Sequence, residues 1–409
     1  MRANDVPVLL LTGYLGSGKT TLVNSILSNK RGIKFAVIVN DIGEVNIDAD
    51  LIEQGGVVGK KDDSLVALQN GCICCTLKMD LVEQLTDIVK QQKFDYIVIE
   101  ASGICEPAPI AQTICSIPTL EEKYTRYGIP RLDCIVTVVD ALRMQSDFGG
   151  GENLTKEYIS EDDLENLVIQ QIEFCNMILL NKASDVSASE RGRLKEIIHA
   201  LQPKAEIIEC DYGKIDLDKI LHTNLFDFDK TATSAAWVRE VEGIHDNDDD
   251  HDDDHDDDHD DDHDNDHDHD HEHHHHHHHD HEGGETEEYG IGTFVYYARK
   301  PFNLGKFDEF VARKMPANVI RCKGICYFSD ERDTCYVFDQ AGKQVTLRNA
   351  GLWYANMPKD ELEDMMRREP ALRRDWDETY GDRMQKLVFI GQHMDKEKIF
   401  NELDQCLTI

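Results

Sequence analysis

The sequence has little positive charge. Its 409 residues include 43 Lys and Arg against 80 Asp and Glu, which gives a formal net charge of −37. Proteins that bind nucleic acid neutralise phosphates with clustered Lys and Arg, so this composition argues against DNA or RNA as a partner. The acidic excess is uneven, because residues 245–281 contain 18 Asp, one Glu and no basic residue.

Long apolar runs are also missing. The first residues, "MRANDVPVLLLTGYLGSGKTT", contain only a short apolar run before the glycines, which predicts neither a signal peptide nor a membrane span. We therefore expect a cytoplasmic protein without membrane contact. In that setting the twelve cysteines are expected to be thiols, some of them metal ligands, and not a disulfide framework.

Strand-like and helical segments alternate through the first 225 residues. Several of the strand candidates are nearly continuous Val, Ile and Leu, which is typical of a parallel sheet covered on both faces. The alternation predicts βαβ units and an α/β fold with a mostly parallel sheet. The predicted strands are 7–13, 34–41, 95–102, 134–141, 177–182 and 205–210.

The rest of the chain divides into a linker and a second domain. Residues 245–281 consist only of His, Asp, Asn and Glu and hold 16 of the 19 histidines, which predicts a disordered segment. Short strands and a few helices resume near Tyr289, as expected for a small α+β domain of about 120 residues. We predict a P-loop domain at 1–228, a linker at 229–288 and a C-terminal domain at 289–409.

The segment "GYLGSGKT", residues 13–20, matches the phosphate-loop pattern G-x-x-x-x-G-K-[ST]. A predicted strand precedes it and a helical pattern follows, so its backbone N–H groups can form an anion cradle at a helix N-terminus. Lys19 is expected to reach the terminal phosphates, and the Thr20 hydroxyl is expected to bind Mg²⁺. The predicted nucleotide-binding residues of this loop are Gly13, Gly16, Ser17, Gly18, Lys19, Thr20 and Thr21.

An acidic residue should complete the Mg²⁺ and water side of this site. Glu100 ends the apolar run "YIVIE", and Gly103 follows three residues later. A carboxylate at that strand end would hold the metal's water shell opposite the γ-phosphate. Asp41, at the end of "AVIVND", is a second candidate. We therefore assign hydrolysis to Lys19 and Thr20 together with Glu100 or Asp41.

The choice of base depends on "LLNKASD". Asn181, Lys182 and a carboxylate resemble the guanine reader N-K-x-D, in which the Asp accepts from the N1 and N2 donors of the base. Here the acid, Asp185, comes one residue late. Guanine is favoured, and ATP stays open as an alternative nucleotide.

Three cysteines, Cys72, Cys74 and Cys75, lie within four residues. Thiolates are soft ligands suited to Zn²⁺ or Cu(I), and Zn²⁺ prefers four tetrahedral N or S ligands. Three thiols leave the fourth position to water, to Glu44 or to a ligand from a partner. The alternatives are buried core cysteines and a redox pair. The close spacing of the three cysteines favours a metal site over core positions, and the C-x-x-C motif of a redox pair is missing.

The histidines of residues 245–281 are a second candidate metal-binding segment. Neutral imidazole binds Zn²⁺, Ni²⁺, Co²⁺ and Cu²⁺, and His-rich tracts favour metal buffering over an acidic spacer. The candidate ligands are His251, His255, His259, His263, His267, His269 and His271. In the C-terminal domain, Cys322, Cys326 and Cys335 are equally consistent with a further metal site and with core positions.

The segments "GYLGSGKTT", "NDIGEVNID", "GCICCTL" and "EASGICEP", in this order, resemble the CobW-type GTPases, which are metallochaperones of the P-loop class. "VIRCKGICYF" and "LVFIGQHMD" resemble that family's C-terminal signatures. The resemblance implies that Cys72, Cys74 and Cys75 bind a transition metal, usually zinc, and that GTP hydrolysis accompanies its delivery. No Cys-Pro docking motif precedes the phosphate loop, so methionine aminopeptidase is not implied as the client.

We therefore expect a GTP-hydrolysing metallochaperone that uses GTP, Mg²⁺ and Zn²⁺ and delivers metal to an unidentified client metalloprotein. Co²⁺ and Ni²⁺ are the alternative metals, and the chain is expected to be a monomer or a homodimer. Two alternative functions stay open. One is a metal buffer based on the His-rich tract, and the other is a GTPase that inserts nickel or cobalt into an enzyme.

Overall fold

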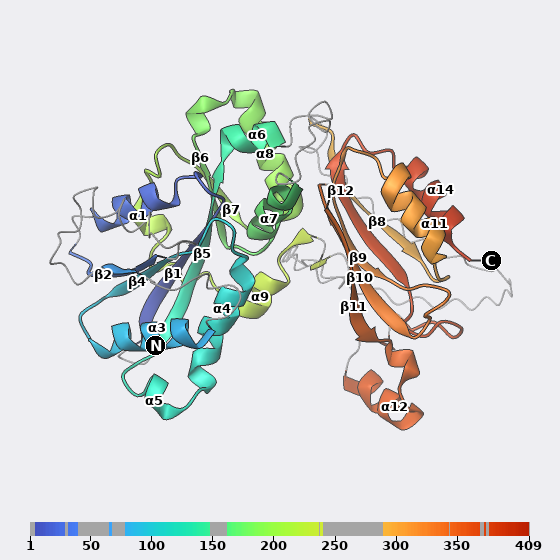
Figure 1. The fold of residues 1–409 in the computed structure, drawn as a ribbon, viewed down its shortest axis with the longest axis horizontal. Helices are drawn as coiled ribbons and strands as arrows, with labels where there is room; N and C mark the ends of the chain where they lie inside the picture. Colours follow the sequence, from blue (N-terminus) through green and yellow to red (C-terminus); the bar gives the residue numbers. More distant parts are fainter. Residues whose placement is uncertain are drawn as a thin grey trace, which may run out of the picture.

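The computed structural model describes residues 5–28, 32–39, 65–67, 78–147, 162–236, 238–239, 289–342, 344–368, 372–373 and 376–408. These residues form two sheets, one from each half of the chain, with helices between them (Figure 1). None of the described helices is long and apolar enough to cross a membrane.

The first sheet has seven strands in the order β3-β2-β4-β1-β5-β6-β7, and every neighbouring pair is parallel. All six predicted strands are present in it, and only the short β3 was not predicted. Every residue of β2, β4 and β6 is buried, as expected for a parallel sheet with both faces covered. The strands are β1 (Val6–Thr12), β2 (Phe35–Val39), β3 (Leu65–Ala67), β4 (Tyr96–Glu100), β5 (Pro130–Asp140), β6 (Met177–Asn181) and β7 (Glu206–Glu209).

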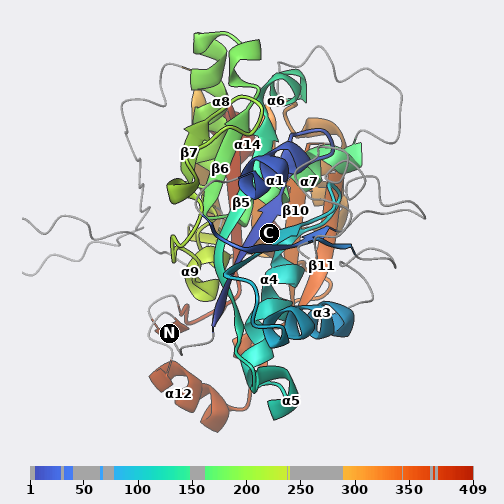
Figure 2. The same cartoon turned by 90° about the vertical axis from the view of Figure 1, so that its left-hand side faces the viewer.

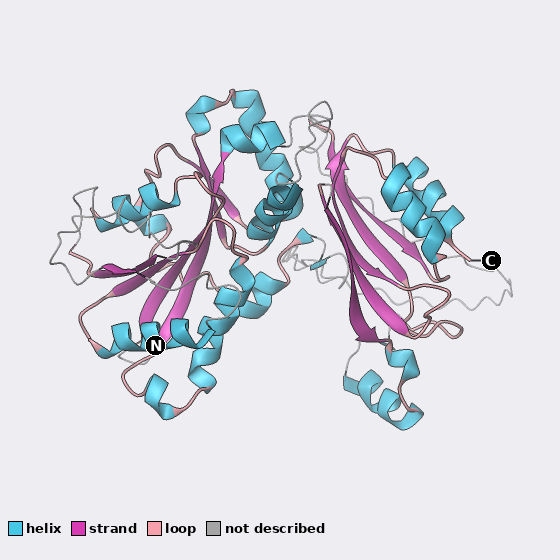
Figure 3. Cartoon of the chain, viewed as in Figure 1, coloured by secondary structure: helices cyan, strands magenta, loops and turns pink. Residues whose placement is uncertain are grey.

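Helices cover both faces of this sheet (Figure 3). On one face α1 packs with residues 210–221, and on the other face α3, α4, α7 and α8 pack over a larger core. This arrangement confirms the predicted α/β P-loop fold. The helices are α1 (Lys19–Leu27), α3 (Lys78–Lys90), α4 (Pro107–Ser116), α5 (Glu122–Thr125), α6 (Ala141–Asp147), α7 (Asp162–Glu173), α8 (Ala188–Leu201) and α9 (Phe228–Ala232).

The second sheet has five antiparallel strands in the order β11-β10-β9-β12-β8, as the predicted α+β class requires. An aromatic-rich core joins one face of it to α11 and α14 (Figure 1). The strands are β8 (Ile291–Ala298), β9 (Val319–Cys326), β10 (Thr334–Ala341), β11 (Gln344–Leu352) and β12 (Gln385–Gln392). The helices are α11 (Leu304–Glu309), which continues as a π-helical turn over Phe310–Lys314, α12 (Lys359–Arg368) and α14 (Lys396–Cys406).

The other face of the second sheet packs on the first domain. Helices α7 and α8 lie between the two sheets (Figure 1), and in the view turned by 90° the second sheet lies behind the first domain (Figure 2). Ile291, Val388 and Ile390 of the second sheet belong to the same buried apolar cluster as Ile169 and Ile172 of α7. The two domains therefore share one continuous core, and their relative position is fixed by packing.

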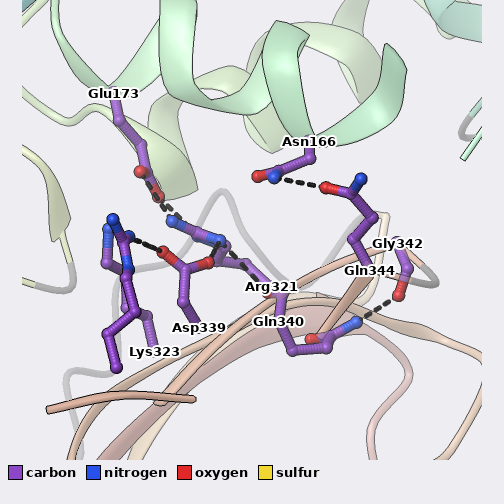
Figure 4. A network of polar contacts seen from close by, with 9 residues as sticks. Asn166, Glu173, Arg321, Lys323, Asp339, Gln340, Gly342 and Gln344 are labelled. Atoms are coloured by element: carbon purple, nitrogen blue, oxygen red, sulfur yellow. Dashed lines mark hydrogen bonds and ion pairs between the residues drawn. The ribbon is translucent and has the colours of Figure 1, made fainter. Parts of the chain in front are cut away.

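A buried ion network crosses this shared core (Figure 4). The guanidinium of Arg321 on β9 has no exposed surface, and it donates two parallel bonds of 2.7 and 2.9 Å to the carboxylate of Glu173 at the end of α7. It also donates to Asp339 on β10, whose other oxygen lies 3.1 Å from Lys323 Nζ. Burial alone would raise the pKa of Asp339, but the charges of Arg321 and Lys323 outweigh it and hold that pKa below its ordinary value.

We predict that Arg321→Met strongly destabilises the protein. The substitution leaves two buried carboxylates without their common partner, and loss of one member of a buried pair costs about 3–5 kcal/mol. Lys314→Met is the matched control, because it removes an exposed Lys side chain that pairs with Glu402. Thermal unfolding of the full chain should show a large fall in Tm for Arg321→Met and almost none for Lys314→Met. Equal falls would contradict the prediction.

Candidate functional site

The phosphate loop connects β1 to α1. Gly13, Gly16 and Gly18 all have positive φ, at 131°, 78° and 108°, a region that favours glycine. Gly13 and Gly18 are also tightly enclosed, since a Cβ on Gly13 would lie 2.2 Å from the Val138 carbonyl oxygen. Gly13 and Gly18 are therefore required by both backbone conformation and space, and Gly16 is favoured by conformation alone. The loop ends at the N-terminus of α1, as an anion cradle requires.

Lys19 lies at the first position of α1 and folds back over the loop. Its Nζ donates to the carbonyl oxygens of Gly13 at 2.7 Å and Tyr14 at 3.2 Å, and its side chain is almost fully buried. The ammonium group is therefore held over the cradle that the loop encloses. Ser17 is also buried there, and its hydroxyl has no hydrogen-bond partner among the described residues.

The Thr20 hydroxyl and the Glu100 carboxylate meet at the edge of this loop. Thr20 Oγ1 donates to Glu100 Oε1 at 2.7 Å, and Glu100 is fully buried at the end of β4. A hydroxyl and a carboxylate side by side form a set of oxygen donors that suits Mg²⁺. The fold brings Glu100 next to the loop because β4 and β1 are parallel neighbours. Asp41, the alternative acid, lies outside the described residues.

The loop after Glu100 packs directly on the phosphate loop. A Cβ on Gly103 would lie 2.6 Å from the backbone nitrogen of Leu15, so only glycine fits there. The buried side chain of Gln171 on α7 donates to the Cys105 carbonyl at 3.1 Å and makes a longer contact of 3.4 Å with the Gly103 carbonyl. The loop is thus held between the phosphate loop and α7.

The predicted base-reading segment follows β6. Asn181 is buried and joins two loops, because its Nδ2 donates to the Ser17 carbonyl at 2.7 Å and its Oδ1 accepts from the Gly213 N–H at 3.1 Å. Lys182 has a left-handed backbone and pairs with Asp140 at the end of β5. Asp185 is exposed on a short 3₁₀ turn.

Sequence reasoning missed three polar residues of this region. Asp140 pairs with Lys182, Asp211 accepts two bonds from Ser184, and Gln171 holds the loop after Glu100. Asp140 and Asp211 follow strands of the parallel sheet, so the same strand-end signal that identified Glu100 could have found them. Gln171 lies in the last turn of an amphipathic helix and carries no comparable signal.

The predicted metal ligands lie outside the described residues. This holds for Cys72, Cys74, Cys75 and Glu44, and also for the histidines between 245 and 281. Within the described parts of the chain, no group of three or more His, Cys, Asp or Glu side chains is arranged to hold a metal ion. Cys322 and Cys326 point into the core beside α11 and α14, and Cys335 packs against a different cluster, so of the two alternatives left open for these cysteines the structure favours core positions.

The described cysteines are poor metal ligands for a physical reason. Seven of the nine are buried. Burial raises the pKa of Cys134 and Cys335 to about 12 and that of Cys210 to about 11, so these thiols stay protonated at neutral pH. Cys134, Cys175 and Cys406 are core residues.

Comparison with known families matches both domains. Residues 7–209 match the family model described as the CobW/HypB/UreG nucleotide-binding domain, and residues 291–407 match the cobalamin synthesis protein cobW C-terminal domain.

Comparison with known proteins gives relatives that match either nearly all of the chain or about half of it. The chain is 34% identical to the Dictyostelium discoideum protein zinc-regulated GTPase metalloprotein activator 1, over 98% of this chain and 80% of that one. It is 34% identical to the Escherichia coli zinc chaperone YjiA, over 56% of this chain and 65% of that one. The crystal structure of Zn(II)-bound YjiA GTPase aligns with 99% of the chain, with a TM-score of 0.39 and 19% identity.

We predict that Gly18→Ala disrupts the phosphate loop more than Gly16→Ala. Both glycines have positive φ, so each substitution adds backbone strain of about 1–2 kcal/mol. Only at Gly18 would the new Cβ meet a neighbour, at 2.3 Å from Asn181 Nδ2, whereas the space beside Gly16 is open. Thermal unfolding without nucleotide should show the larger fall in Tm for Gly18→Ala. The reverse order would contradict the described loop geometry.

Proposed function

The chain belongs to the CobW/HypB/UreG family of P-loop GTPases, and on that basis we propose that it is a metallochaperone that hydrolyses GTP and carries zinc to a client metalloprotein. The observation that carries the nucleotide half of this proposal is the 2.7 Å contact between Thr20 and Glu100. It places a hydroxyl and a carboxylate beside a lysine already held over the phosphate loop.

Each residue of the loop has a distinct task in hydrolysis. The backbone N–H groups of residues 13–20 bind the phosphates, and Lys19 neutralises charge that develops on the transferred phosphoryl group. Thr20 and Glu100 would hold Mg²⁺, which would supply positive charge to the phosphate side of the site. Glu100 is fully buried and accepts from the Thr20 hydroxyl, so its carboxyl group has a fixed position from which it would orient the attacking water.

The metal half of the proposal rests on the cysteines. The twelve cysteines of the sequence include nine described ones, most of them buried with raised pKa values, and the remaining three are Cys72, Cys74 and Cys75. We assign the zinc cargo to these three thiols, with Glu44, water or a client ligand in the fourth position. The names of the relatives, a zinc-regulated activator and zinc chaperones, support zinc over nickel or cobalt.

The position of the cysteines in the sequence suggests how hydrolysis and metal release are coupled. Residues 72–75 directly precede α3 and stand between the phosphate loop and Glu100 in the chain. A segment in that position can respond to the γ-phosphate, as nucleotide-sensing segments of other GTPases do. We therefore assign tight and weak zinc binding to different nucleotide states.

We predict that zinc affinity differs by about 5- to 150-fold between the protein bound to a non-hydrolysable GTP analogue and the protein bound to GDP, the usual range of coupling between two sites. Isothermal titration of Zn²⁺ against both forms measures the difference. It should disappear in the triple variant Cys72→Ser, Cys74→Ser, Cys75→Ser. It should persist in Cys115→Ser, which changes an exposed cysteine on α4 outside the proposed site.

A variant that lacks residues 245–281 serves as the background for this titration. It removes 16 histidines that would bind further zinc ions and obscure the signal. If nucleotide-dependent binding survives in this background, the tract is an accessory buffer. Equal zinc affinity for the two nucleotide forms would contradict the chaperone mechanism, and loss of all zinc binding with the tract would favour the metal-storage alternative.

A further inference from the structure

The base-reading motif of this chain has an unusual fourth position. In N-K-x-D the carboxylate stands three residues after the Asn, and in this sequence that position is Ser184. A serine hydroxyl can form only one donor bond and lacks the charge that attracts the two N–H donors of guanine. The carboxylate must therefore come from elsewhere if the site reads guanine.

The structure provides such a carboxylate directly beside Ser184. Asp211 Oδ1 accepts from the Ser184 N–H at 3.1 Å and from the Ser184 hydroxyl at 2.9 Å. Ser184 follows β6 and Asp211 follows β7, and these strands are parallel neighbours. The carboxyl ends of such strands face the ligand side of an α/β sheet.

Backbone bonds hold the two loops together. The Cys210 N–H donates to the Leu180 carbonyl at 3.0 Å, and the Ala183 N–H donates to the Cys210 carbonyl at 3.2 Å. The Gly213 N–H donates to Asn181 Oδ1, which ties the second loop to the motif's first residue. The position of Asp211 is thus set from both sides.

The same loop also contacts the phosphate-binding helix. A Cβ on Gly213 would lie 3.0 Å from the backbone of Leu22 in the first turns of α1. Asn181 in turn contacts the Ser17 carbonyl of the phosphate loop. Asp211 therefore belongs to a loop that adjoins the nucleotide site, and it does not stand on a remote surface.

Asp185, the acid predicted from sequence, is held less firmly. It is exposed, and among the described residues its side chain forms no hydrogen bond or ion pair. Its backbone N–H closes the short turn back to the Lys182 carbonyl. A carboxylate that must be ordered on binding loses side-chain entropy, whereas Asp211 is already positioned.

We propose that Asp211 is the residue that reads the guanine base and that Ser184 positions it. The acid then lies on the loop after β7, and its supporting hydroxyl lies at the motif position where N-K-x-D has the acid. A carboxylate has about four acceptor positions, and Ser184 occupies two of them on Oδ1. The remaining two match the N1 and N2 donors of guanine. Adenine presents a ring-nitrogen acceptor and a C–H on that edge, which a carboxylate disfavours.

This inference rests on the proposed GTPase function, and it names the residue that determines base specificity. The test compares Asp211→Asn with the matched variant Asp185→Asn, each in the full chain. Xanthine has a carbonyl oxygen in place of the guanine amino group, and an Asn amide can donate to that oxygen. Binding of GDP, XDP and ADP is measured by fluorescence competition.

Asp211→Asn should lose about 10- to 100-fold in GDP affinity, the range expected for hydrogen bonds to a charged group, and should gain affinity for XDP. Asp185→Asn should keep the wild-type preference for GDP. Ser184→Ala should weaken GDP binding to a smaller extent without any gain for XDP, since the carboxylate stays but loses one of its two supporting bonds.

The outcomes separate this inference from the proposed function. If Asp185→Asn switches to XDP and Asp211→Asn does not, the assignment of Asp211 is wrong while the GTPase function stands. If the wild-type chain binds ADP as tightly as GDP, the guanine preference itself fails. Thermal unfolding shows whether Asp211→Asn is folded. If it is not, the XDP preference is measured with Asp211→Gln. In that case, unchanged GDP affinity in Ser184→Ala would contradict the positioning role of Ser184.

Discussion

A single buried guanidinium fixes how the two domains meet. Arg321 has no exposed surface, and a charge in that position is tolerated only because Glu173 and Asp339 both accept from it. The three groups come from α7, β9 and β10. Their geometry therefore adds a directional constraint on the separation and the angle between α7 and the second sheet, beside the apolar contacts that the two domains share.

The same helix links this interface to the nucleotide site. Gln171 holds the carbonyls of the loop after Glu100, and Glu173 holds Arg321 two residues later. The Gln171 carbonyl in turn accepts from Thr137, whose hydroxyl is bonded to Thr12 at the end of β1. A continuous set of buried polar contacts thus runs from the start of the phosphate loop to the C-terminal sheet.

The sequence contained the information for the parallel sheet and for the phosphate side of the site. Lys19 and Thr20 belong to a motif whose contacts are local, and Glu100 could be recognised because it ends an apolar run. Arg321 could not be recognised in this way, because its role comes from partners in other parts of the fold. Asp211 follows a strand as Glu100 does, but its pairing with Ser184 comes from the fold and is not visible in the sequence. The sequence predicts Asp185 as the base-reading acid because it lies next to Asn181 and Lys182 in the chain. In the structure, Ser184 contacts the carboxylate of Asp211, which is 27 residues away.

The shared core also bears on the acidic, histidine-rich insert. Arg239 is the last described residue before the insert and Tyr289 the first after it, and the Tyr289 side chain lies against Gly192 of α8. Because the interface already holds the two domains together, the insert is not needed to determine the distance between them. For a loop whose two ends are already fixed, each doubling of length costs only about 0.6 kcal/mol of closure entropy. The contact between the domains therefore places little constraint on the length of the insert, and a change in its number of histidines would leave both domains in place.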